Sequence, residues 1–326
     1  MLLTQTNLQN KINTNLTSKL HNFTMETNTT NEWVCARLNY NEPWVEFLIK
    51  SVKPFMDTAT KTGMVERYFW ERSYDEGAHI NLYFRCKTDL KDTLLIPNMK
   101  EHFEHYITAK PSFRRRDLPH LAKNNIIQFT DFQPNVEQWG GEVGMPIAER
   151  HFQSSSNAVL EFMALKGEKW SPDEILATAI EMHLAFAEAA DMDTEEATRF
   201  FEYCLLYHAT EDFRLQYFEE FFESQRRPLL DFHGELWDAL QSKIDYKETL
   251  FNDWKEQCFY TTADIVRTFR LRVLKIEAKF SAIWTMYAKL LHKTNNRLGL
   301  HGRDESLVFY LMMRSLEKIA TEKIKM

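Results

Sequence analysis

The sequence predicts an α+β fold in which a small, mainly antiparallel sheet region packs against a predominantly α-helical layer. Segments that alternate apolar and polar side chains are confined to the chain before Gly140, whereas apolar residues recur at helical spacing after it. Only nine glycines and nine prolines interrupt 326 residues, which favours long helices. Strands followed by helices, rather than strands alternating with helices, are typical of the α+β class.

The predicted strands lie in the first third of the chain. Residues 80–85 alternate apolar side chains with more polar ones, and residues 65–72 are rich in aromatic side chains. These two segments flank a turn-like sequence at 74–77, so we expect them to form a hairpin. Further strands are expected at 33–38 and 126–132, and helices at 44–59, after Pro43, and at 99–107. The helices should cover one face of the sheet.

The chain beyond Gly140 and Gly141 is predicted to be helical. Ser171 followed by Pro172 is typical of a helix start, because the serine can cap free N–H groups and proline suits the first turn. Helices are expected at 146–165 and 172–190, from about 193, and at 210–224, 229–256, 259–292 and 304–322.

Residues 1–31 differ in composition from the rest. Asn and Thr dominate them, and they lack the compact apolar block and cleavage site of a signal peptide. We expect a disordered tail here, with Met25 as an alternative start. No linker rich in Pro, Ser or Gly follows, so residues 32–326 are predicted to form a single domain.

Composition argues against several classes of protein. The net charge of −7 disfavours a general nucleic-acid binder, and no apolar run approaches the roughly 18 residues that span a membrane. The four cysteines are far apart, which indicates neither a disulfide framework nor a zinc site and suits a reducing compartment. His102 and His105 are spaced i, i+3 but lack a third ligand. We therefore expect a cytoplasmic protein without metal, organic cofactor, or membrane or nucleic-acid partner.

Three segments carry residues suited to chemistry. They are 68–85 with Arg72 and His79, 132–141 with Gln138, and 290–299 with His292, Asn296 and Arg297. Each has an ordinary structural explanation when taken alone. The first suits a solvated turn, the second a helix entrance with permissive glycines, and the third a helix end closed by Gly299.

Taken together and in this order, the segments resemble the glutamate-elimination domain of class I lanthipeptide and thiopeptide dehydratases, here as a free-standing chain. That family carries a strand ending in Ile-Arg-Tyr, then Gly-x-His-Leu-Arg-Leu-Arg-Phe, then Tyr-x-x-Glu-x-x-Arg-Tyr-Gly-Gly, and finally Leu-His-Met-x-x-Asn-Arg. The resemblance runs from Trp33 to about Lys323. The residues that match at the same spacings are Arg72, Gly77, His79, Leu82, Gly140, Gly141, Glu149, Phe152, His292, Asn296 and Arg297.

The resemblance implies a lyase. In these dehydratases a separate module glutamylates a Ser or Thr of a ribosomal precursor peptide from glutamyl-tRNA. The elimination domain then removes the α-proton and expels glutamate, which leaves dehydroalanine or dehydrobutyrine. The implied partners are the precursor peptide and a separate glutamylation-module protein, and a homodimer is left open.

The same resemblance implies roles for individual residues. His292 would be the acid/base group, Arg72 would clamp glutamate and Arg297 would add charge. The implied substrate-binding residues are Asn296, His79 and Gln138. A shared site would require Arg72 and His292 to converge on one cleft, with Arg297 facing it and Gln138 lining its wall.

The sequence departs from the family at its charged positions. Asn135 and Gln138 stand where the second segment has Glu and Arg, and Asn81 and Tyr83 stand where the hairpin's return strand has two arginines. Ser155 replaces the Asp of a later Asp-Ser pair. A charge-assisted hydrogen bond is worth roughly 1.5–3 kcal/mol, so elimination would need a replacement cation.

Arg114, Arg115 and Arg116 are candidates for that cation by charge alone, although the run also reads as a solvated loop. Two other functions remain open for such a depleted set. One is a pyridine-forming [4+2] cyclase of the thiopeptide type, and the other is a non-catalytic partner that binds a precursor peptide.

Overall fold

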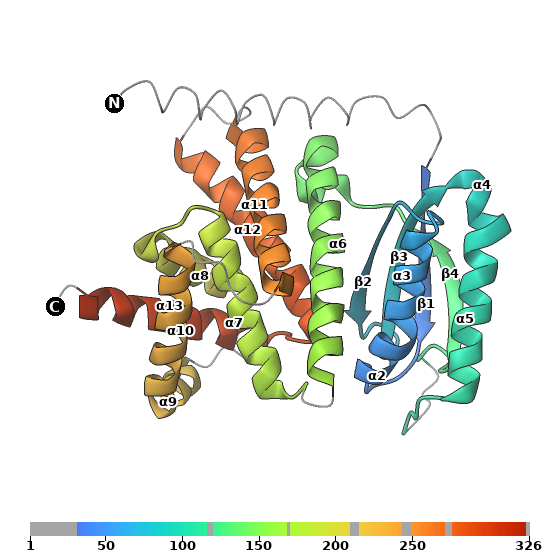
Figure 1. Ribbon diagram of the computed structural model, residues 1–326, viewed down its shortest axis with the longest axis horizontal. Helices are drawn as coiled ribbons and strands as arrows, with labels where there is room; N and C mark the ends of the chain where they lie inside the picture. The colour runs from blue at the N-terminus through green and yellow to red at the C-terminus, as the bar shows by residue number, and fades with distance from the viewer. Residues whose placement is uncertain are drawn as a thin grey trace.

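The computed structural model describes residues 31–115, 120–167, 170–208, 215–242, 249–270 and 276–323. They form a small sheet region beside a larger group of helices, with α6 running between the two (Figure 1). This arrangement confirms the predicted α+β fold. The predicted tail, up to residue 30, and Arg116 lie outside the described residues.

The sheet has four antiparallel strands in the order β2-β3-β1-β4. Their bounds are β1 (Asn31–Asn39), β2 (Arg67–Ser73), β3 (His79–Lys87) and β4 (Ile126–Asp131). The predicted hairpin is the β2–β3 pair, in which Glu71 lies opposite Asn81. Its turn contains Glu76 and Gly77, both with positive φ. Every predicted strand is present, and β2 is the edge strand that faces α6 (Figure 1).

One face of the sheet is apolar and covered by helices. Trp70, Leu82 and Phe84 are fully buried on this face. Phe84 packs edge-on against Phe55 at 5.9 Å, and Phe55 contacts Phe103 at 5.2 Å, which ties the sheet to two helical stretches. The first stretch is α2 (Val45–Phe47), η1 (Leu48–Val52) and α3 (Lys53–Lys61), and the second is α4 (Thr88–Leu90), η2 (Lys91–Leu95) and α5 (Ile96–Ala109).

The remaining helices form the second layer (Figure 1). They follow the short η3 (Val136–Trp139) and are α6 (Gly141–Lys166), α7 (Pro172–Ala189), α8 (Thr194–Tyr207), α9 (Leu215–Ser224), α10 (Arg226–Gln241), α11 (Thr249–Arg270), α12 (Ile276–Leu298) and α13 (Arg303–Lys323). Side chains of Ser171 and Asp193 cap α7 and α8, as the sequence of those helix starts predicts. Buried apolar residues of both layers form a single cluster.

Several helix boundaries differ from the prediction. The helix predicted at 229–256 is divided between α10, which ends at Gln241, and α11, which begins at Thr249. The helix predicted at 259–292 is divided between α11, which ends at Arg270, and α12, which begins at Ile276. Helix α6 begins at Gly141 rather than Pro146, because Gly140 at φ 85° turns the chain directly from η3 into the helix. The expected break near residues 257–258 was wrong, since both lie inside α11. Trp254, Cys258 and Ile265 are all buried at helical spacing, so the apolar face of α11 continues through the expected break. Among the described helices, none is both long and apolar enough to cross a bilayer.

Candidate functional site

The C-terminal half of α12, which carries the third predicted segment, is buried on all sides but one. Between residues 288 and 298, partial solvent exposure is limited to Lys289, His292, Lys293 and Asn296. Their spacing of i, i+3, i+4 and i+7 places them along one side of the helix. We call these four residues the α12 stripe. It combines two ammonium groups, an imidazole and an amide, so it is the side of α12 on which chemistry can take place.

The residues between the stripe positions anchor α12 in the helical layer. Thr294 accepts a hydrogen bond from His151 of α6, with 3.2 Å between Oγ1 and Nε2. Asn295 accepts one from His183 of α7, with 2.7 Å between Oδ1 and Nε2. All four side chains are fully or almost fully buried. Because successive helical residues point about 100° apart, these bonds fix the rotation of α12 and the direction of the stripe.

Asn296 and Arg72 join α12 to the sheet. The Asn296 amide accepts from the Arg72 N–H and donates to the Arg72 carbonyl, both at 2.9 Å, so it substitutes for a neighbouring strand at the edge of β2. The Arg72 guanidinium donates to the carbonyls of Arg297 and Leu298 at 3.1 and 3.4 Å and lies over the Trp44 ring. Burial lowers the pKa of Arg72 to about 10, so it stays cationic at neutral pH. Arg72 thus caps the carbonyl end of α12.

Arg297 lies fully buried beneath the stripe. Its Nε donates to Ser156 Oγ at 2.8 Å, its Nη1 donates to the Lys293 carbonyl at 2.7 Å, and its Nη2 lies 3.8 Å from Glu71 Oε1. The guanidinium also lies over the Phe152 ring at 5.5 Å. Burial lowers the pKa of Arg297 to about 10 against the opposing influence of Glu71. In this position Arg297 places a buried positive charge close to the Glu71 carboxylate.

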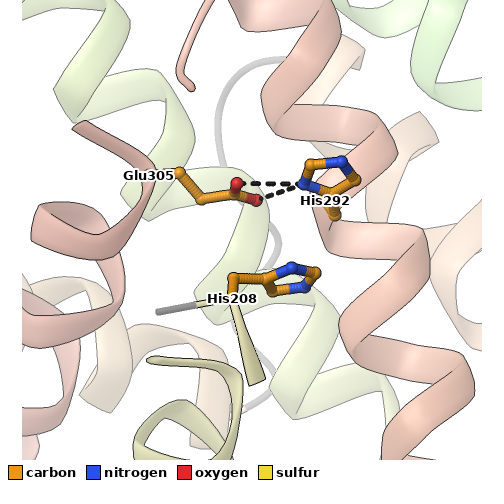
Figure 2. A group of neighbouring side chains, drawn as sticks. All are labelled: His208, His292 and Glu305. Carbon is orange, nitrogen blue, oxygen red and sulfur yellow. Dashed lines mark hydrogen bonds and ion pairs between the residues drawn. The ribbon is translucent and has the colours of Figure 1, made fainter. Parts of the chain in front are cut away.

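His292 is hydrogen-bonded to a buried carboxylate (Figure 2). Its Nδ1 lies 3.0 and 2.9 Å from the two oxygens of Glu305, and because a carboxylate only accepts, Nδ1 carries the proton. The His292 side chain is 44% exposed, whereas that of Glu305 is 3% exposed. Figure 2 shows Nε2 on the far side of the ring from Glu305. This nitrogen is therefore the one available for proton transfer with a substrate.

Glu305 is held in its ionised form by its neighbours. It lies in the first turn of α13 and accepts a further hydrogen bond from Asn295 Nδ2 at 3.0 Å. Burial opposes ionisation, but the hydrogen bond and charge of His292, helped by His208 and Asn295, outweigh burial and lower the pKa of Glu305. A buried carboxylate that receives Nδ1–H fixes the tautomer and orientation of an imidazole and stabilises its protonated form.

His208, at the end of α8, stacks on His292 with ring centroids 4.8 Å apart and ring planes 16° apart (Figure 2). Its Nε2 donates to the Ala288 carbonyl at 3.1 Å, and burial lowers its pKa. His208, His292 and Glu305 each offer one atom that could bind a metal, and these three atoms lie within 4.8 Å of one another. Imidazole binds a metal in the plane of its ring at about 2.0–2.1 Å. Two nearly parallel stacked rings cannot both do so, and the three residues as placed do not fit a metal ion.

Glu71 neutralises one cation of the stripe. Lys293 Nζ lies 2.9 Å from the Glu71 carboxylate, and both side chains are mostly buried. Glu71 belongs to β2 and lies on the sheet face opposite α3 and α5. The Arg297 guanidinium also lies near the Glu71 carboxylate. Lys293 and Glu71 therefore form a charge pair that joins the stripe to strand β2.

Lys289 connects the stripe to the second predicted segment. Its Nζ donates to the Gln138 carbonyl at 2.9 Å. The Asn135 side chain in turn accepts the Gln138 N–H at 3.3 Å and caps η3. Gln138 itself is exposed, and its backbone carbonyl is the atom that contacts the stripe.

The sheet face near the stripe carries no arginine at the two positions where the resembled family has them. Tyr83 stacks on Phe69 at 4.5 Å and contacts Phe132 at 4.4 Å. The Asn81 carbonyl oxygen accepts a long contact of 3.9 Å from the Cys35 thiol. This part of the face carries an aromatic cluster, and the charged residues Glu71 and Arg37 lie on either side of Asn81.

The structure brings some of the predicted site residues together and not others. His292 and Asn296 lie in the α12 stripe, Arg297 lies directly beneath it, and Gln138 lies beside it. Arg72 holds the end of the same helix, but no hydrogen bond or ion pair joins it to His292 among the described interactions. The predicted convergence of these two side chains on one cleft therefore has no contact to support it.

The remaining predicted residues have structural partners. His79 is buried in the hairpin, where its Nδ1 lies 2.7 Å from the Gly77 carbonyl. Arg114 donates to the Ala122 carbonyl at 2.6 Å. His102 lies 2.9 Å from the Ser51 carbonyl. None of these contacts involves the stripe.

Three residues around His292 were not identified from the sequence: Lys289, His208 and Glu305. Lys289 could have been found, because it precedes His292 by three residues on a predicted helix. Glu305 reads in sequence as an acidic residue in a first helical turn, where the helix dipole favours it. His208 is far from His292 in the chain, and no local pattern signals their contact.

The fold of this chain is similar to three solved structures. The pyridine synthase TbtD from thiomuracin biosynthesis superposes with a TM-score of 0.75 at 13% identity and covers 89% of this chain and 99% of its own. The tRNA-dependent lantibiotic dehydratase MibB from Microbispora sp. 107891 gives 0.66 at 16% identity over 92% of this chain but only 29% of MibB. TsrL gives 0.63 at 15% identity over 90% of this chain and 96% of its own.

At these identities the three structures show a shared fold. No curated protein matches the sequence. A sequence profile described as lantibiotic biosynthesis dehydratase C-term, however, matches residues 33–316, which is most of the chain. The chain belongs to the family of lantibiotic biosynthesis dehydratase C-terminal domains.

Proposed function

We propose that this protein eliminates glutamate from glutamylated Ser or Thr of a precursor peptide, as the stand-alone elimination component of a split dehydratase. The observation that carries the proposal is the partly exposed His292, whose Nδ1–H is held by the buried Glu305 and whose Nε2 is free. A histidine held in this way can take up and release a proton at neutral pH. Membership of the dehydratase family supplies the reaction class.

In the proposed reaction His292 Nε2 removes the α-proton of the glutamylated residue. The C–H electron pair forms the Cα=Cβ bond, and the Cβ–O bond breaks toward the oxygen. The glutamate α-carboxylate leaves with that electron pair, because glutamyl-tRNA donates glutamate through its α-carboxyl group, and the side-chain carboxylate stays free throughout. Glu305 stabilises the imidazolium that forms, and His292 then returns its proton to solvent or product.

The other residues that match the family's motifs position His292 and its surroundings in this proposal. Arg72 holds the carbonyl end of α12, and Asn296 fixes that end to β2. Arg297 supports the Glu71–Lys293 pair from below. A precursor peptide is the proposed substrate, and a separate glutamylation-module protein is the proposed partner that supplies it.

A pyridine-forming [4+2] cyclase is the second candidate. The observation that favours it is the aromatic cluster of Tyr83, Phe69 and Phe132, in which Tyr83 stands where the resembled family has an arginine. An aromatic surface suits an uncharged dehydrated peptide better than a leaving group with two carboxylates. TbtD, described as a pyridine synthase, also matches this chain over almost its whole length.

The test uses the full chain with two synthetic peptides. Elimination predicts that a peptide with O-glutamyl serine yields a dehydroalanine product and free glutamate, both measured by mass spectrometry. His292→Ala should abolish the product, whereas His105→Ala, at an exposed position of α5, should not. If the wild type instead cyclises a bis-dehydroalanine peptide and releases no glutamate, the cyclase candidate is correct. If neither peptide reacts while a precursor peptide binds, the protein is a non-catalytic partner.

A further inference from the structure

We propose that Lys289 binds the carboxylate of the departing glutamate and so provides the substrate cation of the α12 stripe. The inference rests on the proposed elimination function, and it concerns a residue that is not among the catalytic or binding residues expected from the sequence. It starts from position: Lys289 precedes His292 by three residues, and the two side chains leave the same side of α12. An anion bound to Lys289 would therefore lie on the same side of α12 as the acid/base residue His292.

The charge of Lys289 has no counter-charge in the part of the chain that the structure describes. Its one polar contact among the described residues is the neutral carbonyl of Gln138 at 2.9 Å. Burial alone lowers its pKa, and no carboxylate raises it. A half-buried ammonium with only a carbonyl partner is poorly compensated, and an anionic ligand would compensate it.

The other cations near His292 are already engaged. Lys293 is paired with Glu71 at 2.9 Å, and Arg297 is fully buried with bonds to Ser156 and a backbone carbonyl. Arg72 is directed at the carbonyl end of α12. Lys289 is thus the cation of this group that can exchange its partner for a substrate carboxylate without breaking an ion pair.

The contact with Gln138 also fits this role. A carbonyl oxygen holds the ammonium in place, but as a neutral acceptor it competes weakly with a carboxylate. Lys289 can keep that bond and use its remaining donors for the ligand, because an ammonium group has three. The expected ligand class is an acyl group with a free carboxylate, attached to a peptide Ser or Thr.

The test measures binding of two stable peptide analogues in which an amide replaces the scissile ester. One carries glutamate joined through its α-carboxyl to diaminopropionate, and the other has the glutamate side-chain carboxylate converted to carboxamide. The full-length wild type should bind the carboxylate analogue more tightly. Lys289→Met should weaken that binding about 10- to 100-fold, the range for one charge-assisted hydrogen bond, and should leave the carboxamide analogue unchanged.

Two variants control the measurement. Lys289→Arg should keep most of the preference for the carboxylate, and Lys100→Met, at an exposed position of α5, should keep all of it. Circular dichroism and the melting temperature should confirm that each variant is folded. Equal binding of both analogues by the wild type, or unchanged binding by Lys289→Met, overturns the proposal.

Failure of the inference is distinguishable from failure of the proposed function. If the wild type and Lys289→Met release glutamate from the O-glutamyl peptide equally, elimination stands and the role of Lys289 is refuted. If the wild type shows the Lys289-dependent preference but releases no glutamate, the carboxylate site stands and the elimination function is refuted.

Discussion

Replacing Glu305 with Gln tests whether the buried carboxylate tunes His292 or only fills space. Gln keeps the shape of the side chain and can still accept from His292 Nδ1, but it removes the negative charge. The lost term is one charge-assisted hydrogen bond, from Nδ1 to a carboxylate that is 3% exposed, worth roughly 1.5–3 kcal/mol. If this energy stabilises the imidazolium formed in the transition state, kcat falls about 10- to 150-fold.

The assay is glutamate release from an O-glutamyl serine peptide, with kcat and KM measured separately. KM should change little, because Glu305 does not reach solvent. A fall in kcat at unchanged KM indicates that an interaction made in the transition state has been lost.

A matched control is Glu219→Gln. Glu219 also reaches α13 from another helix, but it bonds Tyr310 and Arg314 rather than a histidine. This variant should leave kcat unchanged. The reasoning about Glu305 is refuted if Glu305→Gln retains the wild-type kcat while remaining folded.

Three further predictions concern stability and the neighbouring segment. Gly299→Ala should lower the free energy of unfolding, measured in urea, by about 1–3 kcal/mol, because Gly299 has φ +95° and an added Cβ would lie 2.6 Å from Arg72 Nη1. Gly63 also has a positive φ but open space around it, so Gly63→Ala measures the backbone contribution alone. Equal losses in the two variants would contradict the Arg72 contact. Burial lowers the pKa of His233 to about 3, so its contribution to the free energy of unfolding is present above about pH 6.5 and is lost as pH falls, by about 2 kcal/mol between pH 6.5 and 5. His233→Leu should flatten that dependence, and an unchanged slope would contradict it. Gln138→Arg should raise glutamate release or leave it unchanged, and a decrease would count against a cationic requirement at this position.

The sequence predicted strands and helix starts correctly where a short-range pattern indicates which side chains are buried or which residue caps a helix. The alternation at 80–85 identified β3, and the caps at Ser171 and Asp193 identified helix starts, because both depend on short-range physics. The break expected near residues 257–258 failed for a matching reason. No cap or breaker stands there, and the buried positions of α11 continue at helical spacing through it.

The site was less predictable because its contacts are tertiary. His292 was identified from its segment, but its partner Glu305 follows a turn and belongs to another helix. An arginine in a motif also does not reveal its acceptor. Arg72 was expected at a substrate carboxylate, and in the structure its donors reach the carbonyls at the end of α12. The same donor geometry serves either partner, so only the packing distinguishes them.

The segment from His292 to Arg297 shows how one reactive residue depends on its neighbours. Thr294 bonds α6, Asn295 bonds α7 and α13, and Asn296 bonds β2. A helix held from that many directions cannot rotate without breaking several buried hydrogen bonds, each costly to leave unmade. His292 is therefore fixed at its Glu305 partner with Nε2 outward, although its own side chain is nearly half exposed. In a motif of this kind most residues serve to orient the one that reacts, and substituting Asn295 should lower kcat in the glutamate-release assay although its side chain is fully buried.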